Sequence, residues 1–283
     1  MKGIIVGTDF SESSINALMH ATTIADKAKC DITLIWAKTP GTTLGLMSEN
    51  ASEYADLAQK QLNKIAEDHK TLMPKGKKII TKIIEGKVHQ VLAREALEMQ
   101  ADLVVVGTHG VSGEDEVFIG NNAYRTVISV NCPVLTIRNQ TKVSRALTDI
   151  IVPIDYSQES RQKLPIAVKF AKLFSAKIHV LGLYTSELKE VRQLVDAYMH
   201  TVDKYLNSNN IRYQMYKRES FNANETTVNF AKEIDANLIV IMTEQSSDFT
   251  GIWLGSQARD MINNCCFPVL SVTSSDFFAT YSK

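Results

Sequence analysis

The feature that most constrains the fold is an order of strand-like and helix-like segments that occurs twice along the chain. In the first half, short apolar runs alternate with stretches of helical periodicity. Strands are expected at 3–8, 31–37, 78–84, 102–106 and 133–137, and helices at 13–27, 51–69, 88–99 and 121–130. The apolar runs are almost continuous in Ile, Val and Leu, which favours a parallel sheet with helices on both faces.

The second half of the chain repeats this order. Strands are expected at 149–153, 177–183, 211–216, 237–241 and 268–272, and helices at 160–174, 188–206, 225–234 and 256–264. Short motifs recur as well: Asp9-Phe10-Ser11 is echoed by Asp155-Tyr156-Ser157, and Pro133-Val134-Leu135 by Pro268-Val269-Leu270. The polar stretch 139–144 joins the two copies. We therefore expect two similar α/β domains, at 1–140 and 146–283.

Charge and composition exclude several classes of partner. The 283 residues contain 31 Lys and Arg against 31 Asp and Glu, so no net field draws the chain to nucleic acid or to anionic lipid. No apolar stretch reaches the length of a bilayer-spanning helix, and the apolar run at the N-terminus is too short for a signal peptide. The four cysteines form no CxxC pair, which favours reduced thiols and a cytoplasmic location. The histidines have no metal-ligand spacing, so no metal site is expected.

The segment after the fourth strand of the first half has the composition of an anion-binding loop. It begins Gly107-Thr108-His109-Gly110 and ends Gly120-Asn121-Asn122, where a helix is expected to start. Glycines allow the backbone to approach a phosphate closely, and a helix N-terminus presents unpaired N–H groups and a positive dipole end. In an open parallel sheet, ligands bind at this carboxyl edge.

The glycine spacing of this loop resembles that of the universal stress proteins. Nucleotide-binding members of that family carry G-x2-G-x9-G followed by Ser or Thr, and Gly107, Gly110 and Gly120 have the same spacing. The resemblance covers essentially the whole chain as two tandem copies. It extends to the Asp after the first strand and to the segment Cys132-Pro133-Val134-Leu135 before the fifth strand.

The resemblance implies a stress-response protein with two Rossmann-like domains, each a five-stranded parallel sheet in the order 3-2-1-4-5. It implies that the domains pair within the chain as a pseudo-dimer through segments 134–137 and 269–272, and it leaves open a homodimer and unknown protein partners. It also implies an adenine nucleotide (ATP, ADP or AMP) in the first domain. The nucleotide would be bound by Asp9, Ala37, Gly107, Thr108, His109, Gly110, Gly120, Asn121 and Asn122.

Two departures from the family pattern bear on the first site. Asn121 replaces the expected hydroxyl residue, but it can still cap the helix and donate from its amide. The loop also carries Glu114-Asp115-Glu116, three carboxylates that would repel a triphosphate unless Mg²⁺ intervenes.

The second copy departs further from the pattern. Asp155, Gly255 and Ser256 match family positions, but Met242 and Gln245 stand where the first two glycines would be. Side chains there obstruct close approach of the backbone to a phosphate. We therefore interpret this copy as a degenerate site that binds nucleotide poorly or not at all.

Asp9, Asp155 and His109 also have purely structural interpretations that involve no ligand. Asp9 and Asp155 each precede a Ser by two positions and could simply shape the turn into a helix. His109 is better interpreted as a solvated loop residue than as a general base, because no nucleophilic residue lies at a recognisable catalytic spacing from it in the sequence.

Three functions follow from the sequence. The leading one is a regulatory or interaction module that binds an adenine nucleotide. The alternatives are a nucleotide-independent scaffold and a slow ATPase; dedicated catalysis is disfavoured because no catalytic residues and no Walker A motif are visible.

Overall fold

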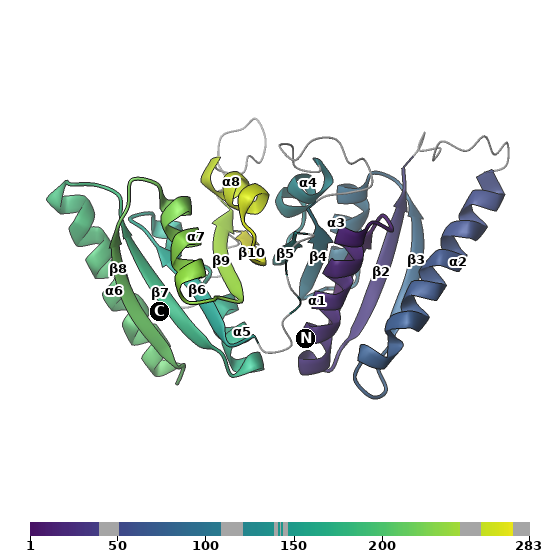
Figure 1. Cartoon of the computed structure of the whole chain (residues 1–283), viewed down its shortest axis with the longest axis horizontal. Coiled ribbons are helices and arrows are strands. Elements are labelled where there is room, and N and C mark those ends of the chain that lie inside the picture. Colours follow the sequence, from purple (N-terminus) through teal and green to yellow (C-terminus); the bar gives the residue numbers. More distant parts are fainter. Residues whose placement is uncertain are drawn as a thin grey trace. The chain divides into compact units, whose positions relative to one another are not determined.

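The chain forms two compact units, Met1–Val143 and Ser144–Lys283. The computed structural model describes residues 1–39, 51–108, 121–138, 141, 143, 147–243 and 256–273, and each unit is described by itself. In the described part of each unit, strands and helices alternate and the strands form one parallel sheet (Figure 1).

The first unit places its strands in the order β3-β2-β1-β4-β5. Its elements are β1 (Gly3–Thr8), α1 (Glu12–Ala28), β2 (Asp31–Lys38), α2 (Ala51–His69), the 3-10 helix η1 (Lys70–Leu72), β3 (Ile79–Glu85), α3 (Val88–Glu98), β4 (Leu103–Gly107), α4 (Asn121–Ser129) and β5 (Val134–Ile137). Right-handed crossovers place α1 and α2 on one face of this sheet and α3 and α4 on the other, and α3 contacts α4.

The second unit has the equivalent order β8-β7-β6-β9-β10. Its elements are β6 (Asp149–Ile154), the 3-10 helix η2 (Gln158–Arg161), α5 (Leu164–Phe174), β7 (Lys177–Tyr184), α6 (Lys189–Ser208), β8 (Tyr213–Glu219), α7 (Ala223–Glu233), β9 (Leu238–Thr243), α8 (Ser256–Asn264) and β10 (Val269–Thr273). The expected α/β class and strand order are therefore confirmed in both units.

The central strands form the cores. Ile4, Ile5 and Val6 of β1 are fully buried, as are Ile150, Ile151 and Val152 of β6. These strands are covered on both faces, which explains why the sequence shows continuous apolar runs instead of alternation. None of the helices in the described ranges combines the length and apolarity that a bilayer crossing requires.

One expected helix differs between sequence and structure. The pattern predicted a single helix over 160–174, but the structure has a short 3-10 helix, η2, followed by α5 from Leu164. Pro165 explains the break, because its ring nitrogen has no hydrogen to donate to the preceding turn and its ring clashes with the carbonyl four residues earlier. In α5 it lies in the first turn, where no donor is needed.

Candidate functional site

The carboxyl edge of the first sheet brings together residues that are far apart in sequence. β1 pairs with β2 so that Thr8 lies opposite Trp36, and it pairs with β4 so that Val6 lies opposite Val105. Asp9, which follows β1, therefore lies at the same edge as Ala37 near the end of β2 and Thr108 after β4. Asp9 and Ala37 are half-buried, and Thr108 is buried.

The other predicted residues of this site fall into two groups. Asn121 and Asn122 open helix α4, and the Asn122 side chain is exposed. His109, Gly110, Gly120 and the three carboxylates at 114–116 lie outside the described residues. The structure thus brings together the ends of β1, β2 and β4.

Asp9 organises the turn that leads into α1. Its Oδ1 accepts hydrogen bonds from the backbone N–H of Ser11 (3.1 Å) and from the Ser11 hydroxyl (2.5 Å). Ser11 is the N-cap of α1, and its Oγ accepts from the N–H of Ser14 at 3.2 Å. This geometry supports the interpretation of Asp9 as a turn-forming residue, whatever else its carboxylate contacts.

Gly107 is required for packing within the protein itself. A Cβ at this position would lie 2.5 Å from the Ser13 Oγ, 2.8 Å from the Ser13 carbonyl carbon and 2.9 Å from the Ser13 oxygen. Two of these atoms belong to the backbone of α1, so they cannot rotate away. The first glycine of the loop motif therefore lets α1 lie directly against the end of β4.

The second unit repeats the Asp9 turn at Asp155. Asp155 Oδ1 accepts from the backbone N–H of Ser157 (2.7 Å) and from its hydroxyl (2.5 Å). The hydroxyl of Ser160 then donates to the carbonyl of Ser157 at 2.8 Å. The same carboxylate turn therefore precedes a helix in both copies.

Met242 lies at the end of β9, in the position of Gly107. Glu159 stands where the first unit has Ser13, and it belongs to η2, which contacts β9. The break in the helix before Pro165 thus accompanies a larger residue at the strand end. Gln245 and Gly255 lie outside the described residues, and Ser256 begins α8.

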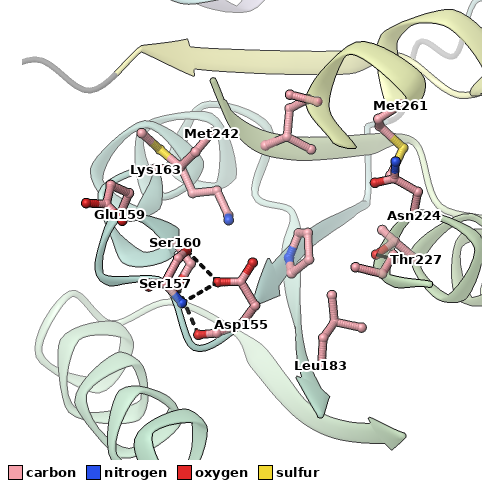
Figure 2. Close-up of a pocket in the computed structure, with 14 residues that line it drawn as sticks. Asp155, Ser157, Glu159, Ser160, Lys163, Leu183, Asn224, Thr227, Met242 and Met261 are labelled. Carbon is pink, nitrogen blue, oxygen red and sulfur yellow. Dashed lines mark hydrogen bonds between the residues drawn. The ribbon is translucent and has the colours of Figure 1, made fainter. Parts of the chain in front are cut away.

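A pocket opens at this edge of the second unit (Figure 2). Its lining comes from the ends of β6, β7 and β9, from the loop after β6, from η2, from the residue before α5, from the beginning of α7 and from α8. Asp155, Ser157 and Met242 are lining residues that the sequence had singled out. Lys163 and Thr227 also line the pocket, and sequence reasoning missed both.

Lys163 is the unexpected residue of this pocket. Its side chain is only 4% exposed, and burial lowers its pKa to about 8 although the nearby Asp155 carboxylate acts in the opposite direction. An alignment of the two copies could have identified Lys163, because the first copy has no lysine at the equivalent position. Asp155 stands 146 residues after Asp9, and the residue 146 positions before Lys163 is Ala17.

Side chains that could bind a metal are not grouped in the described part of the chain. No three His, Cys, Asp or Glu residues there gather in an arrangement that could hold an ion. His179, which is buried, instead takes part in a partly buried polar cluster. Its Nε2 lies 2.7 Å from Asp149 Oδ1, and its Nδ1 lies 3.2 Å from the Tyr216 hydroxyl.

Comparisons with known proteins agree with this architecture. A universal stress protein of Methanocaldococcus jannaschii is 30% identical over 149 residues, which are 50% of this chain and 84% of that protein. A solved universal stress protein of Archaeoglobus fulgidus superimposes with a TM-score of 0.77 at 16% identity, with 97% of each chain covered. The model of the Universal stress protein family matches residues 1–138 and again residues 147–273. The chain therefore belongs to the universal stress protein family, and it carries two copies of the family domain in tandem.

Proposed function

We propose that the first unit binds an adenine nucleotide at the carboxyl edge of its sheet, and that the chain acts in the cytoplasm as a regulatory or interaction module. One observation carries the proposal. The strand order reverses between β1 and β4, and Asp9 and Thr108 directly follow these two strands. Ligands of open parallel sheets bind where the strand order reverses.

The surroundings of this point suit a nucleoside. Ala37 is small and half-buried, and it lies at the end of the neighbouring strand, where a larger side chain would occupy the space of a flat base. Helix α4 begins at Asn121, and its N-terminus favours an anion. We place the phosphates of the nucleotide near the N-terminus of α4, together with Mg²⁺ when the nucleotide is a triphosphate.

The second unit has a different role in this proposal. Met242 occupies the position of Gly107, so we expect no adenine nucleotide with its phosphates at the end of β9. The second unit instead completes a pseudo-dimer within the chain. Partner choice would then depend on the nucleotide held by the first unit.

Calorimetric titration of the full chain with ATP, ADP and AMP tests the proposal. Binding with one nucleotide per chain is expected, and Gly110→Val should weaken it more than tenfold because a β-branched side chain would intrude on the phosphates. Tenfold corresponds to about 1.4 kcal/mol, which is within what one lost hydrogen bond to a charged group costs.

Gly3→Val is the matched control. Gly3 begins β1 at the opposite end of the strand, and a Cβ there meets only the Asp31 carbonyl oxygen, at 3.9 Å. The control should retain the affinity of the unmodified chain. A wild-type chain that binds none of the three nucleotides would overturn the proposal in favour of a nucleotide-independent scaffold.

A further inference from the structure

The pocket of the second unit contains a buried lysine whose ammonium group receives no hydrogen-bond acceptor from the described residues. Lys163 forms neither an ion pair nor a hydrogen bond there, although its side chain is almost completely buried. Lysines are rarely buried to this extent unless they are paired, because an unpaired charge loses its hydration. Figure 2 shows the side chain extending from the start of α5 into the pocket.

The hydroxyl groups on the walls are already used within the protein. The Ser157 hydroxyl donates to Asp155 Oδ1, the Ser160 hydroxyl to the Ser157 carbonyl at 2.8 Å, and the Thr227 hydroxyl to the Ala223 carbonyl at 2.7 Å. An ammonium group has three donors and no acceptor. The Lys163 ammonium is therefore the group of the pocket that can donate hydrogen bonds to an acceptor on a bound ligand.

Asp155 supplies the complementary group. Its Oδ1 is held by Ser157, and its carboxylate faces the same space as the Lys163 ammonium (Figure 2). The two groups are close enough to interact, yet no ion pair joins them. The pocket thus offers a donor cation and a carboxylate acceptor at separate points.

We propose that this pocket binds a small hydroxylated organic anion, whose singly charged oxyanion group lies on Lys163 and whose hydroxyl donates to Asp155. Asp155 and Glu159 line the same pocket, so a polyphosphate would be repelled more strongly than a monoanion. Ala17 stands at the corresponding position of the first unit, so the site belongs to the second unit alone. The proposal does not rest on nucleotide binding by the first unit.

Thermal unfolding of the full chain in sodium glycerate, compared with sodium chloride at equal ionic strength, tests this site. Glycerate should raise the melting temperature of the wild-type chain, and sulfate should raise it less. In Lys163→Met the effect of glycerate should disappear. The same variant should melt higher than wild type in chloride, because an apolar side chain replaces a buried ammonium group that forms no ion pair.

Lys172→Met is the matched control. Lys172 belongs to α5, which begins directly after Lys163, but it is exposed and its ammonium donates to Asn209. This variant should respond to glycerate as wild type does. The proposal is overturned if glycerate leaves the wild type unchanged, if Lys163→Met responds as wild type does, or if Lys163→Met melts lower than wild type in chloride.

A measurement on the unmodified chain gives a second, independent test. The stabilisation by glycerate should decline as the pH rises through about 8, where Lys163 loses its proton. The other charged groups lining the pocket are the carboxylates of Asp155 and Glu159. A glycerate effect that is constant from pH 7 to pH 9 would contradict the role of Lys163.

Discussion

Gly107 shows that a glycine predicted to contact a ligand can also be required by the packing of the protein itself. The glycine spacing of the loop assigns it to a ligand, whereas the structure gives it a contact with the backbone of Ser13. A Cβ at 2.8–2.9 Å from main-chain atoms forces α1 away from β4. If a Gly107 variant lost nucleotide binding, the loss could therefore come from disturbed packing of α1 against β4 as well as from a lost contact with the ligand.

We expect Gly107→Ala to destabilise the protein in the absence of any nucleotide. Overpacking of a well-packed interior typically costs about 1–3 kcal/mol. Urea denaturation of this variant should show that loss, whereas Gly3→Ala, whose Cβ meets nothing closer than 3.9 Å, should unfold near the wild-type midpoint. Equal stability of Gly107→Ala and wild type would mean that the glycine is there for the ligand only.

The buried side chain of His20 makes the free energy of unfolding depend on pH. Its side chain is buried in α1, its Nε2 has no hydrogen-bond partner in the described residues, and burial lowers its pKa from 6.5 to about 4, against a hydrogen bond with the Thr141 backbone. The unfolded chain therefore binds a proton more readily than the folded one. This contribution to stability is complete above pH 6.5 and is lost as the pH falls through 4.

His20→Gln should flatten the dependence of stability on pH between 6.5 and 4. At 1.36 kcal/mol per pKa unit, the variant should lose about 3 kcal/mol less than wild type over that range. His89 also has a pKa lowered by burial and acts with the same sign, so part of the slope will remain. The exposed His200→Gln is the control, and a slope that is the same in His20→Gln and wild type would refute the assignment.

At the scale of elements, the strands buried on both faces were predictable and the partly exposed ones less so. β1, β4 and β6 follow apolar runs, and the structure agrees with the expected bounds to within one residue. The expected strand 211–216 instead spans Tyr213–Glu219. Among the described strands, β8 has one neighbour, β7, and its last residues are charged. Two of them form ion pairs with α6: Lys217 with Asp196, and Glu219 with Arg192.

The candidate sites were predictable only where they depend on strand ends. Asp9, Ala37 and Thr108 could be placed at one edge because parallel strands end together. Lys163 could not, since a lysine within a helical pattern is usually solvated. Its burial depends on how α5 restarts after η2, and periodicity alone did not reveal that break.

At the scale of the whole molecule, the absence of net charge makes local charges decisive for a nucleotide. With 31 basic and 31 acidic residues, no overall field compensates for the three carboxylates Glu114, Asp115 and Glu116. These residues lie outside the described part of the chain, so two cases are open to experiment. Either the carboxylates face the phosphates, or they lie in solvent, where their effect is screened beyond about 8–10 Å.

We expect the first case, in which ATP requires Mg²⁺ far more than AMP does. Only the longer anion extends its charge toward the carboxylates, and the metal offsets that repulsion. Replacing the three residues together by Gln, Asn and Gln should tighten metal-free ATP binding and leave AMP binding nearly unchanged, as measured by calorimetry with and without EDTA. Because AMP serves as the internal control, a general change in the protein would affect both ligands. An ATP affinity that depends on neither Mg²⁺ nor the triple substitution would place the carboxylates in solvent, and phosphate binding would then rest on the backbone of the loop and the N-terminus of α4.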